Sequence, residues 1–237
     1  MYDSEVAEIW DAIYTGRGRD YGAEARDVAE LIRKLRPDAD SLLDVACGTG
    51  EHLRHFRGLF GHVEGVELSG DMIAVGRQRS PSLPLHQGDM RSFDLGRRFD
   101  AVTCLFSSIG HMRTTAELNA AIGRLAAHVG PGGIVVVEPW WFPDTFADGY
   151  VTGDVVRSGE RVIGRVSHSR REGDVSRVSA HFTVAEPEAG LRHFTEELLI
   201  TLFTREQYED AFRTAGGTVE HLPQGPAGRG MFVGVFS

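Results

Sequence analysis

The sequence feature that most constrains the fold is the stretch Asp44-Val45-Ala46-Cys47-Gly48-Thr49-Gly50. It follows an apolar pair, Leu42 and Leu43, and precedes a helical pattern, so strand, tight turn and helix are predicted in succession. Gly48 and Gly50 allow a sharp bend and let a ligand approach where a Cβ would collide. The first N–H groups of the helix have no partner within the helix and can bind that ligand. We therefore predict a small-molecule pocket at this turn.

A second predicted strand, Val63-Glu64-Gly65-Val66-Glu67, ends in an acid that follows Gly50 by seventeen residues. A carboxylate at this place can bind the two hydroxyls of a ribose. A nicotinamide dinucleotide would use the same acid, and it is the alternative. Its fingerprint, however, has a third glycine, whereas this chain continues with Glu51, an acid that would repel a pyrophosphate. An adenosine with an amino-acid tail fits better, and the turn resembles the first motif of class I S-adenosylmethionine-dependent methyltransferases.

The pattern beyond this turn predicts an α/β fold with a doubly wound, mostly parallel Rossmann-like sheet. Predicted strands alternate with helices, and they lie near 41–46, 62–67, 84–87, 99–106 and 132–138. The run 134–137 is apolar on both faces and therefore belongs in the interior of the sheet. Ser69 is expected to cap one helix, and Thr114 with Glu117 is expected to form a capping box at another.

Additional segments are predicted on both sides of this unit, within a single domain, 1–237. Residues 1–36 are expected to contain two helices, over 3–13 and from a cap at Asp20 to Pro37, that close over a cofactor. Residues 144–203 are expected to form an antiparallel insertion that covers a substrate site or a dimer contact. Its three strands are predicted from the alternation of apolar and polar residues near 160–170, 174–186 and 191–203.

The chain is expected to end with a helix and a hairpin that return to the central sheet. The helix begins after Thr204, which forms a capping box with Gln207. The hairpin is predicted over 217–222 and 230–236. It frames a loop that is rich in glycine and contains Arg229.

Composition and charge exclude several classes of function. The net charge of −9 and the isoelectric point near 5.6 argue against a nucleic-acid partner, because nucleic-acid binding needs a basic surface. The two cysteines, Cys47 and Cys104, lie in apolar strand-like stretches and fit no zinc-site spacing. Asp3 and Glu5 stand where a signal peptide would be basic, and no apolar run is long enough to cross a bilayer. We therefore expect a soluble, cytoplasmic enzyme without a membrane partner.

The carboxyl edge of the predicted sheet carries the candidate binding residues, because ligands of open parallel sheets bind there. Asp89 and Met90 follow the third strand; Asp89 can accept the hydrogens of an adenine amino group, and Met90 can lie against the ring. The alternative is that Asp89 only caps a helix. The fourth strand ends in Leu105, and it delivers the hydroxyl of Ser108 and the imidazole of His111 to the same edge.

Methyl transfer from a sulfonium needs in-line approach of a neutral nucleophile, so orientation and water exclusion are the main tasks of the protein, and no metal is needed. His111 is the candidate that positions an amine and receives its proton; the alternative is a structural histidine. His52 and His55 share a helix face without a third ligand and are expected to be exposed to solvent rather than to bind a metal. Three further histidines could pair across the inserted strands: His168, His181 and His193.

The run Glu138-Pro139-Trp140-Trp141-Phe142-Pro143 is more specific than the fold, because nothing in a methyltransferase fold demands two adjacent tryptophans after the fifth strand. Taken with other stretches, it resembles the N,N-dimethyltransferases that finish the amino sugars of macrolide antibiotics. These are the dTDP-3-amino-3,6-dideoxyhexose enzymes of desosamine and mycaminose biosynthesis. The other matching stretches are Tyr14 to Tyr21, Leu42 to Gly50, Leu85 to Arg91, Phe106 to Ser108, Arg165 to Ser169 and Gly225 to Gly230.

The resemblance implies an enzyme that methylates the amino group of a dTDP-linked amino-deoxyhexose twice, with S-adenosylmethionine as the cofactor. Together with the glycine turn, it implies cofactor contacts from Arg17, Tyr21, Asp44, Ala46, Gly48, Gly50, Glu67, Asp89, Met90 and Leu105. On the substrate side it implies Tyr14, Ser108, Trp141, Arg165, Ser169 and Arg229, with Tyr2 and His111 as catalytic residues near the reacting amine.

Physical chemistry agrees with part of this assignment. Arg229 lies in a glycine-rich loop and suits a diphosphate, and aromatic side chains can stack on a thymine. Family members have His or Tyr at position 111, so orientation of the amine is a sufficient role there. The family's crystal dimers imply a homodimer. Two alternatives stay open: a small-molecule O-methyltransferase of the same fold and a noncatalytic nucleotide-binding homologue.

Overall fold

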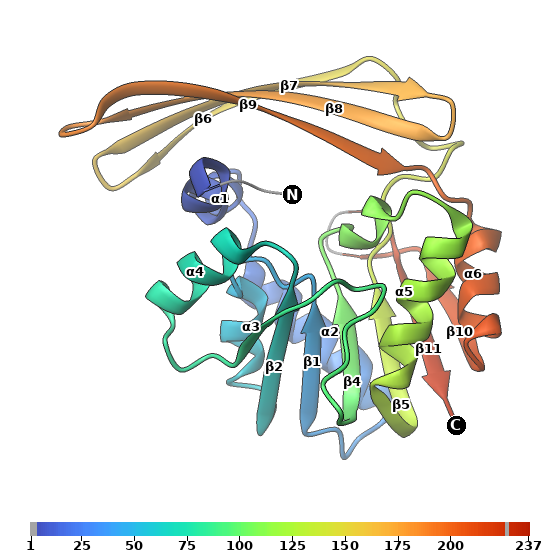
Figure 1. The fold of residues 1–237 in the computed structure, drawn as a ribbon. Coiled ribbons are helices and arrows are strands. Elements are labelled where there is room, and N and C mark those ends of the chain that lie inside the picture. Colours follow the sequence, from blue (N-terminus) through green and yellow to red (C-terminus); the bar gives the residue numbers. More distant parts are fainter. Residues whose placement is uncertain (1–3, 226–227) are drawn as a thin grey trace.

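The computed structural model describes residues 4–225 and 228–237. It contains a seven-stranded sheet with helices on both faces and, above it, a separate four-stranded antiparallel sheet (Figure 1). Helix α1 (Ser4–Gly16) lies between the two sheets. In the described part of the chain, no helix is both long and apolar enough to span a membrane.

The seven-stranded sheet has the order β10-β11-β5-β4-β1-β2-β3. Strands β1 to β5 run parallel to one another. On the β5 side, β11 pairs antiparallel with β5, and β10 pairs antiparallel with β11. The predicted doubly wound, mostly parallel fold is therefore confirmed. The strands are β1 (Ser41–Val45), β2 (His62–Glu67), β3 (Leu85–Gln87), β4 (Phe99–Cys104), β5 (Val129–Val137), β10 (Gly217–Leu222) and β11 (Met231–Phe236).

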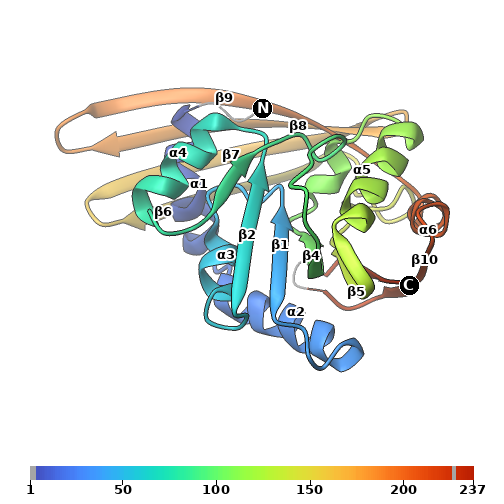
Figure 2. The same ribbon diagram turned by 60° about the horizontal axis from the view of Figure 1, so that its bottom comes forward.

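Helices cover both faces of this sheet, because its central strands are apolar on both sides (Figure 2). One face packs against α2 (Tyr21–Leu35), α3 (Glu51–Phe56) and α4 (Gly70–Arg79). The other face packs against α5 (Thr115–Ala127) and α6 (Arg205–Thr214).

The predicted helix caps are largely present. Asp20 and Ser69 each accept an N–H of their helix, and Thr204 forms the expected capping box with Gln207. The box at Thr114 is only half formed. Its hydroxyl accepts the N–H of Glu117, but the Glu117 carboxylate accepts the N–H of residue 113 instead of that of Thr114.

The four-stranded sheet has the order β6-β7-β8-β9, with one strand more than predicted. The missed strand is β6 (Tyr150–Ser158), which is an edge strand whose apolar residues Val151 and Val155 point outward. It therefore lacks the buried apolar stripe by which a strand is recognised. The other strands are β7 (Arg161–Glu172), β8 (Val175–Glu186) and β9 (Gly190–Thr201).

Helix α1 joins the two layers. Ile9 and Ile13 are fully or almost fully buried against Ile163 and Phe182 of the four-stranded sheet. The opposite side of the helix faces the glycine turn through Asp11, whose carboxylate accepts the hydroxyl of residue 49. The helix thus places a polar wall over the carboxyl edge of the larger sheet.

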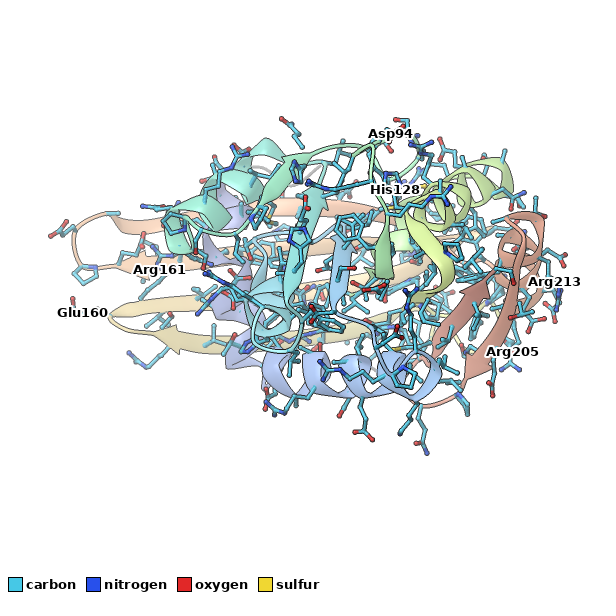
Figure 3. All side chains as sticks on the ribbon, turned by 90° about the horizontal axis from the view of Figure 1, so that it is seen from below. Asp94, His128, Glu160, Arg161, Arg205 and Arg213 are labelled. Carbon is cyan, nitrogen blue, oxygen red and sulfur yellow. The ribbon has the colours of Figure 1, made fainter. Side chains whose placement is uncertain are left out.

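The opposite edge of the larger sheet is fixed by His128, which Figure 3 shows near Asp94. The Nδ1–H of His128 donates to the carbonyl oxygen of Arg124 at 2.7 Å, and its Nε2 accepts the N–H of Leu95 at 3.1 Å. The ring also stacks on Phe93, with centroids 4.3 Å apart. These contacts tie the long loop after β3 to the end of α5.

Candidate active site

A cavity of about 480 Å³ opens at the carboxyl ends of β1, β2 and β4. Residues of α1, α2, α3 and α4 and the last residues of β9 also line it. Ten of the residues that the sequence singled out line it: Tyr21, Asp44, Ala46, Gly48, Glu67, Asp89, Met90, Leu105, Ser108 and His111. The rule that ligands of parallel sheets bind at the carboxyl edge explains why these residues converge.

The glycine turn has the conformation that its sequence requires. Gly48 and Gly50 have φ angles of 59° and 83°, in the left-handed region. A Cβ added at Gly48 would meet no protein atom within 4 Å, and Gly48 lines the cavity. Gly50 instead packs against Leu83, 3.4 Å from such a Cβ, and forms the N-cap of α3. Gly48 is therefore the glycine that leaves room for a ligand.

Glu67 is held rigidly beside this turn. One carboxylate oxygen accepts the N–H of Gly48 at 2.9 Å, and the other accepts the N–H of Ser69 at 2.8 Å. A carboxylate oxygen can accept a second hydrogen bond, so each can also receive a hydroxyl hydrogen from a ligand. The geometry suits a pair of ribose hydroxyls.

Two more carboxyl groups face the cavity from a buried position. Asp44 is 2% exposed, and burial raises its pKa to about 6 although it accepts a 2.7 Å hydrogen bond from Thr103. Burial also raises the pKa of Asp11 to about 6, against the effects of its hydrogen bond from Thr49 and of its ion pair with Arg79. The lining holds more acids than bases, which favours a ligand with a positive centre.

Tyr21 and His52 form the wall where α2 crosses α3. The Tyr21 hydroxyl is buried and has no hydrogen-bond partner among the described residues, so it can donate to a ligand. His52 is 7% exposed and lies 2.8 Å from Glu24. The prediction that His52 is exposed is therefore wrong, because α2 packs over it and supplies an acid; His55 is exposed.

Asp89 lies at the rim of the cavity. Its carboxylate accepts the backbone N–H of Arg91 at 2.9 Å and forms an ion pair with the guanidinium of the same residue. The hydrogen bonds from Arg91 lower the pKa of Asp89. The carboxylate is thus ionised at neutral pH and can accept further hydrogens.

The turn after β4 is strained. Phe106 and Ser107 have φ angles of 58° and 62°, a region that residues with a Cβ rarely adopt. The turn continues into the 3-10 helix Ser108–His111, which brings His111 into the cavity. Burial, with a smaller effect of the Arg113 charge, lowers the pKa of His111 to about 4. The imidazole is therefore neutral at pH 7.

Aromatic rings and guanidinium groups gather on the other side of Phe106. The Tyr14 ring lies 4.7 Å from that of Phe106, and the Arg19 guanidinium lies 3.8 Å from the Phe106 centroid. Burial raises the pKa of Tyr14, while the charges of Arg165 and Arg17 act in the opposite direction. These groups form a second, arginine-rich region next to the cavity.

Arg165 and Arg229 differ in how their charges are compensated. Arg165 is 9% exposed and donates to Ser167, but it forms no ion pair with a carboxylate of the described residues. Arg229 pairs with Glu138 at 3.0 Å and lies over both Trp140 and Trp141, 5.1 and 5.4 Å from their rings. Both guanidinium groups can bind an anion.

The remaining predicted residues that the structure describes lie outside the cavity. Arg17 pairs with Asp154 of β6 at 2.9 Å. Ser169 is buried on the face of β7 that also carries Arg165. Tyr2 lies outside the described residues. The expected pairing of three histidines is wrong, because the residues directly opposite them are serine, threonine and valine: Val151 and Ser179 face His168, Val166 and Thr195 face His181, and Thr183 faces His193.

Several residues of the cavity were not predicted. Trp10 and Asp11 come from α1, and Leu198 comes from β9. They reach the cavity through packing between segments far apart in the sequence, and no local pattern marks them. Thr49 and Phe106 lie inside stretches that had been singled out, so their place in those motifs was the available signal. No group of three or more potential metal ligands occurs among the described residues.

Comparison with known proteins places this site in context. Residues 42–133 match the family model described as a methyltransferase domain. The chain is 57% identical to the dTDP-3-amino-3,4,6-trideoxy-alpha-D-glucopyranose N,N-dimethyltransferase of Streptomyces venezuelae, with 99% of each chain covered. It is 50% identical to the dTDP-4-amino-2,3,4,6-tetradeoxy-D-glucose N,N-dimethyltransferase of Saccharopolyspora spinosa, with 99% of this chain and 94% of that protein covered.

A solved structure agrees with these relatives. The protein is similar to CalS10, an amino pentose methyltransferase from Micromonospora echinaspora whose structure was determined with bound S-adenosylmethionine. The TM-score is 0.89 at 49% identity, and 97% of each chain is covered. Both curated relatives are named as N,N-dimethyltransferases, and all three proteins are named as methyltransferases.

Proposed function

We propose, from the premise that this chain belongs to the S-adenosylmethionine-dependent dTDP-amino sugar N,N-dimethyltransferases, that its acceptor carries the amine on carbon 3 of the hexose. The identity to the 3-amino enzyme is 57%, against 50% for the 4-amino enzyme. Incubation with each dTDP-amino sugar and S-adenosylmethionine, followed by mass spectrometry, tests the proposal. Two methyl groups should be added faster to the 3-amino sugar, and faster dimethylation of the 4-amino sugar would refute it.

The observation that carries the cofactor assignment is the open glycine turn beside a fixed carboxylate. Bound S-adenosylmethionine supplies a methyl group on a positively charged sulfur. Glu67 would hold the ribose hydroxyls, Asp89 and Met90 the adenine, and Asp44 and Tyr21 the amino-acid end. The buried, unpartnered Tyr21 hydroxyl and the acidic lining support this assignment. Residues 1–36 would act as the cap over it, which the place of Asp11 in the cavity wall supports.

His111 would orient the acceptor amine. A neutral imidazole can accept a hydrogen bond from the amine N–H and so turn the nitrogen lone pair toward the cofactor. The lowered pKa of His111 and its place in the cavity wall support this role. Ser108 would provide a second polar group on the same turn. Tyr2 stays a predicted partner of His111, outside the described residues.

The arginine-rich region would bind the dTDP part of the substrate. Arg229 and Arg165 would hold the diphosphate, which is consistent with the buried guanidinium of Arg165, which forms no ion pair with a carboxylate of the described residues. Tyr14 and Trp141 would contact the thymine or the sugar, and Ser169 would add a hydroxyl. The position of Tyr14 against Phe106 connects this region to the cavity that contains His111.

A homodimer and a cytoplasmic location complete the proposal. The outer face of the four-stranded sheet exposes large apolar side chains, with Val151, Val155, Val166 and Leu191 between 60% and 76% exposed. A second copy would cover such a face. The cytoplasmic location is supported by the free state of both cysteines, Cys47 and Cys104.

A further inference from the structure

Glu138 is a buried carboxylate for which the function described so far has no role. Its side chain is 1% exposed and follows directly after β5. Its N–H donates to the carbonyl oxygen of Cys104 at 2.9 Å, so Glu138 stands beside the end of β4. A carboxylate in this position needs partners, because burial of an unpaired charge is costly.

One partner is the strained turn after β4. The Oε2 atom of Glu138 accepts the N–H of Phe106 at 2.7 Å. The neighbouring hydroxyl of Ser107 donates to the carbonyl oxygen of Pro139 at 2.7 Å. Two consecutive residues with positive φ persist only where the surroundings fix them, and here the end of β5 provides both contacts.

The turn determines where three wall residues of the cavity lie. Phe106 lines the cavity itself, and the 3-10 helix that follows carries Ser108 and His111. A small rotation of the turn would therefore move the imidazole relative to the cofactor pocket. Misplacement of a reacting group by about 1 Å can cost on the order of a hundredfold in rate.

The other partners of Glu138 are arginines of the neighbouring region. Its Oε1 atom accepts a hydrogen bond from Arg229 at 3.0 Å. Arg19 lies 3.8 Å from Oε2, and its guanidinium covers the Phe106 ring. One carboxylate thus connects the strained turn with the arginine that would bind the diphosphate.

We infer that Glu138 is a positioning residue of the methyl transfer, which fixes the Phe106–Ser107 turn and thereby the place of His111. The part that concerns Arg229 rests on the proposed function; the part that concerns the turn does not. Glu138→Gln keeps the size of the side chain and one acceptor oxygen. Its amide cannot accept from both Phe106 and Arg229 on two separate oxygens, so one contact must be lost.

The test measures KM and kcat, and kcat is expressed per S-adenosylmethionine-binding site counted by calorimetry. Glu138→Gln should lower kcat about tenfold or more and change the Kd of S-adenosylmethionine by less than about twofold. Glu64→Gln is the matched control, because Glu64 is equally buried, pairs with Arg97 and lies outside the cavity. It should lower the melting temperature and leave kcat unchanged. The assay uses whichever dTDP-amino sugar the wild-type enzyme methylates, so an error in the acceptor assignment leaves this test intact.

A second arm separates the turn from Arg229. In an Arg229→Gln background, the loss of kcat on changing Glu138 should persist, since Glu138 acts through the turn. An unchanged kcat per site, or a loss that disappears in that background, overturns the inference. Where Glu138→Gln does not fold, Ser107→Ala probes the same turn. A lowered kcat with unchanged cofactor affinity then supports the inference, and an unchanged kcat overturns it.

Discussion

At the scale of single residues, the cavity keeps groups that cost stability. Asp44 is buried and ionised at neutral pH, although burial raises its pKa to about 6 from an ordinary 3.8. When folding raises the pKa of an acid, the folded protein loses stability as the pH increases toward and through the raised pKa. We attribute its presence to the positive centre of the ligand, since residues that serve binding are often unfavourable for the empty protein.

Asp44→Asn should therefore stabilise the protein without cofactor above pH 6. Because folding raises the pKa of Asp44 from 3.8 to about 6, the variant should gain at most about 3 kcal/mol in the free energy of unfolding at pH 8. The advantage should vanish below about pH 4, where Asp44 is protonated in the folded and unfolded states alike. Urea denaturation at the two pH values measures it. The same variant should bind S-adenosylmethionine more weakly, and a gain of stability that is equal at both pH values would contradict the explanation.

Arg229 gives a second prediction at this scale. Arg229→Gln should raise the KM for the dTDP-amino sugar about tenfold or more, because a charge-assisted bond to the diphosphate is lost. The Kd of S-adenosylmethionine should not change. Arg213→Gln is the control, since Arg213 is an exposed arginine of α6 that forms ion pairs with Glu209 and Asp210 of its own helix. Equal KM values for the two variants would remove Arg229 from the substrate site.

At the scale of elements, a buried carboxylate fixes the β3 edge of the larger sheet. In β2, Glu64 accepts hydrogen bonds from His62 at 2.6 Å and from His86 at 2.7 Å, and it pairs with Arg97. Burial alone would raise the pKa of Glu64, but these partners together outweigh burial and lower it. The carboxylate therefore ties the edge strand β3 and the loop after it to the centre of the sheet.

Glu64→Gln should destabilise the protein by about 3 kcal/mol at pH 7, because one partner of a buried charge cluster is removed. A lowered folded-state pKa contributes stability that is present above the unfolded value, about 4.3, and is lost as the pH falls through the folded value. The difference between variant and wild type should thus shrink below about pH 4. Urea denaturation curves that are the same for variant and wild type at pH 7 would refute this role.

The central sheet could be predicted from the sequence because its signals are local. Strands buried on both faces are continuous apolar runs, and residues such as Asp20 and Ser69 mark helix starts through their own side chains. Strand β6 could not be predicted, since Thr152 and Asp154 precede Val156 on the face toward α1, whereas Val151 and Val155 point outward. Helical spacing alone also gave no sign that Glu24 would cover His52.

The candidate site divides in the same way. Residues at the ends of β1, β2 and β4 follow from the rule on parallel sheets. The contribution of Asp11 could not be predicted, because it depends on how α1 is held between the two sheets. The role inferred for Glu138 needs the left-handed conformation of Phe106, and no sequence pattern indicates that conformation.

At the scale of the whole molecule, the antiparallel sheet uses its two faces differently. One face packs against α1, and the other points away from the remainder of the chain (Figure 1). Val155 and Val166 lie on that outer face, 76% and 60% exposed. Apolar side chains gathered on one sheet face are typical of an interface.

Val155→Glu combined with Val166→Glu should convert a dimer to a monomer, because burial of two charges opposes association. Sedimentation velocity measures the change. Leu35→Glu is the control, since Leu35 is an exposed apolar residue at the end of α2, on the larger layer. A monomeric wild-type protein, or a double variant that still dimerises, would contradict the assignment of this face.

The central claim is that the open glycine turn holds the cofactor, and binding of S-adenosylmethionine to Gly48→Val tests it most directly. Gly96→Val is a close match, because Gly96 also has a positive φ, 64° against 59°, and open surroundings, but it lies outside the cavity. Titration calorimetry should show one bound cofactor per chain for the wild type and Gly96→Val, and none for Gly48→Val. Equal binding by all three proteins would contradict the account.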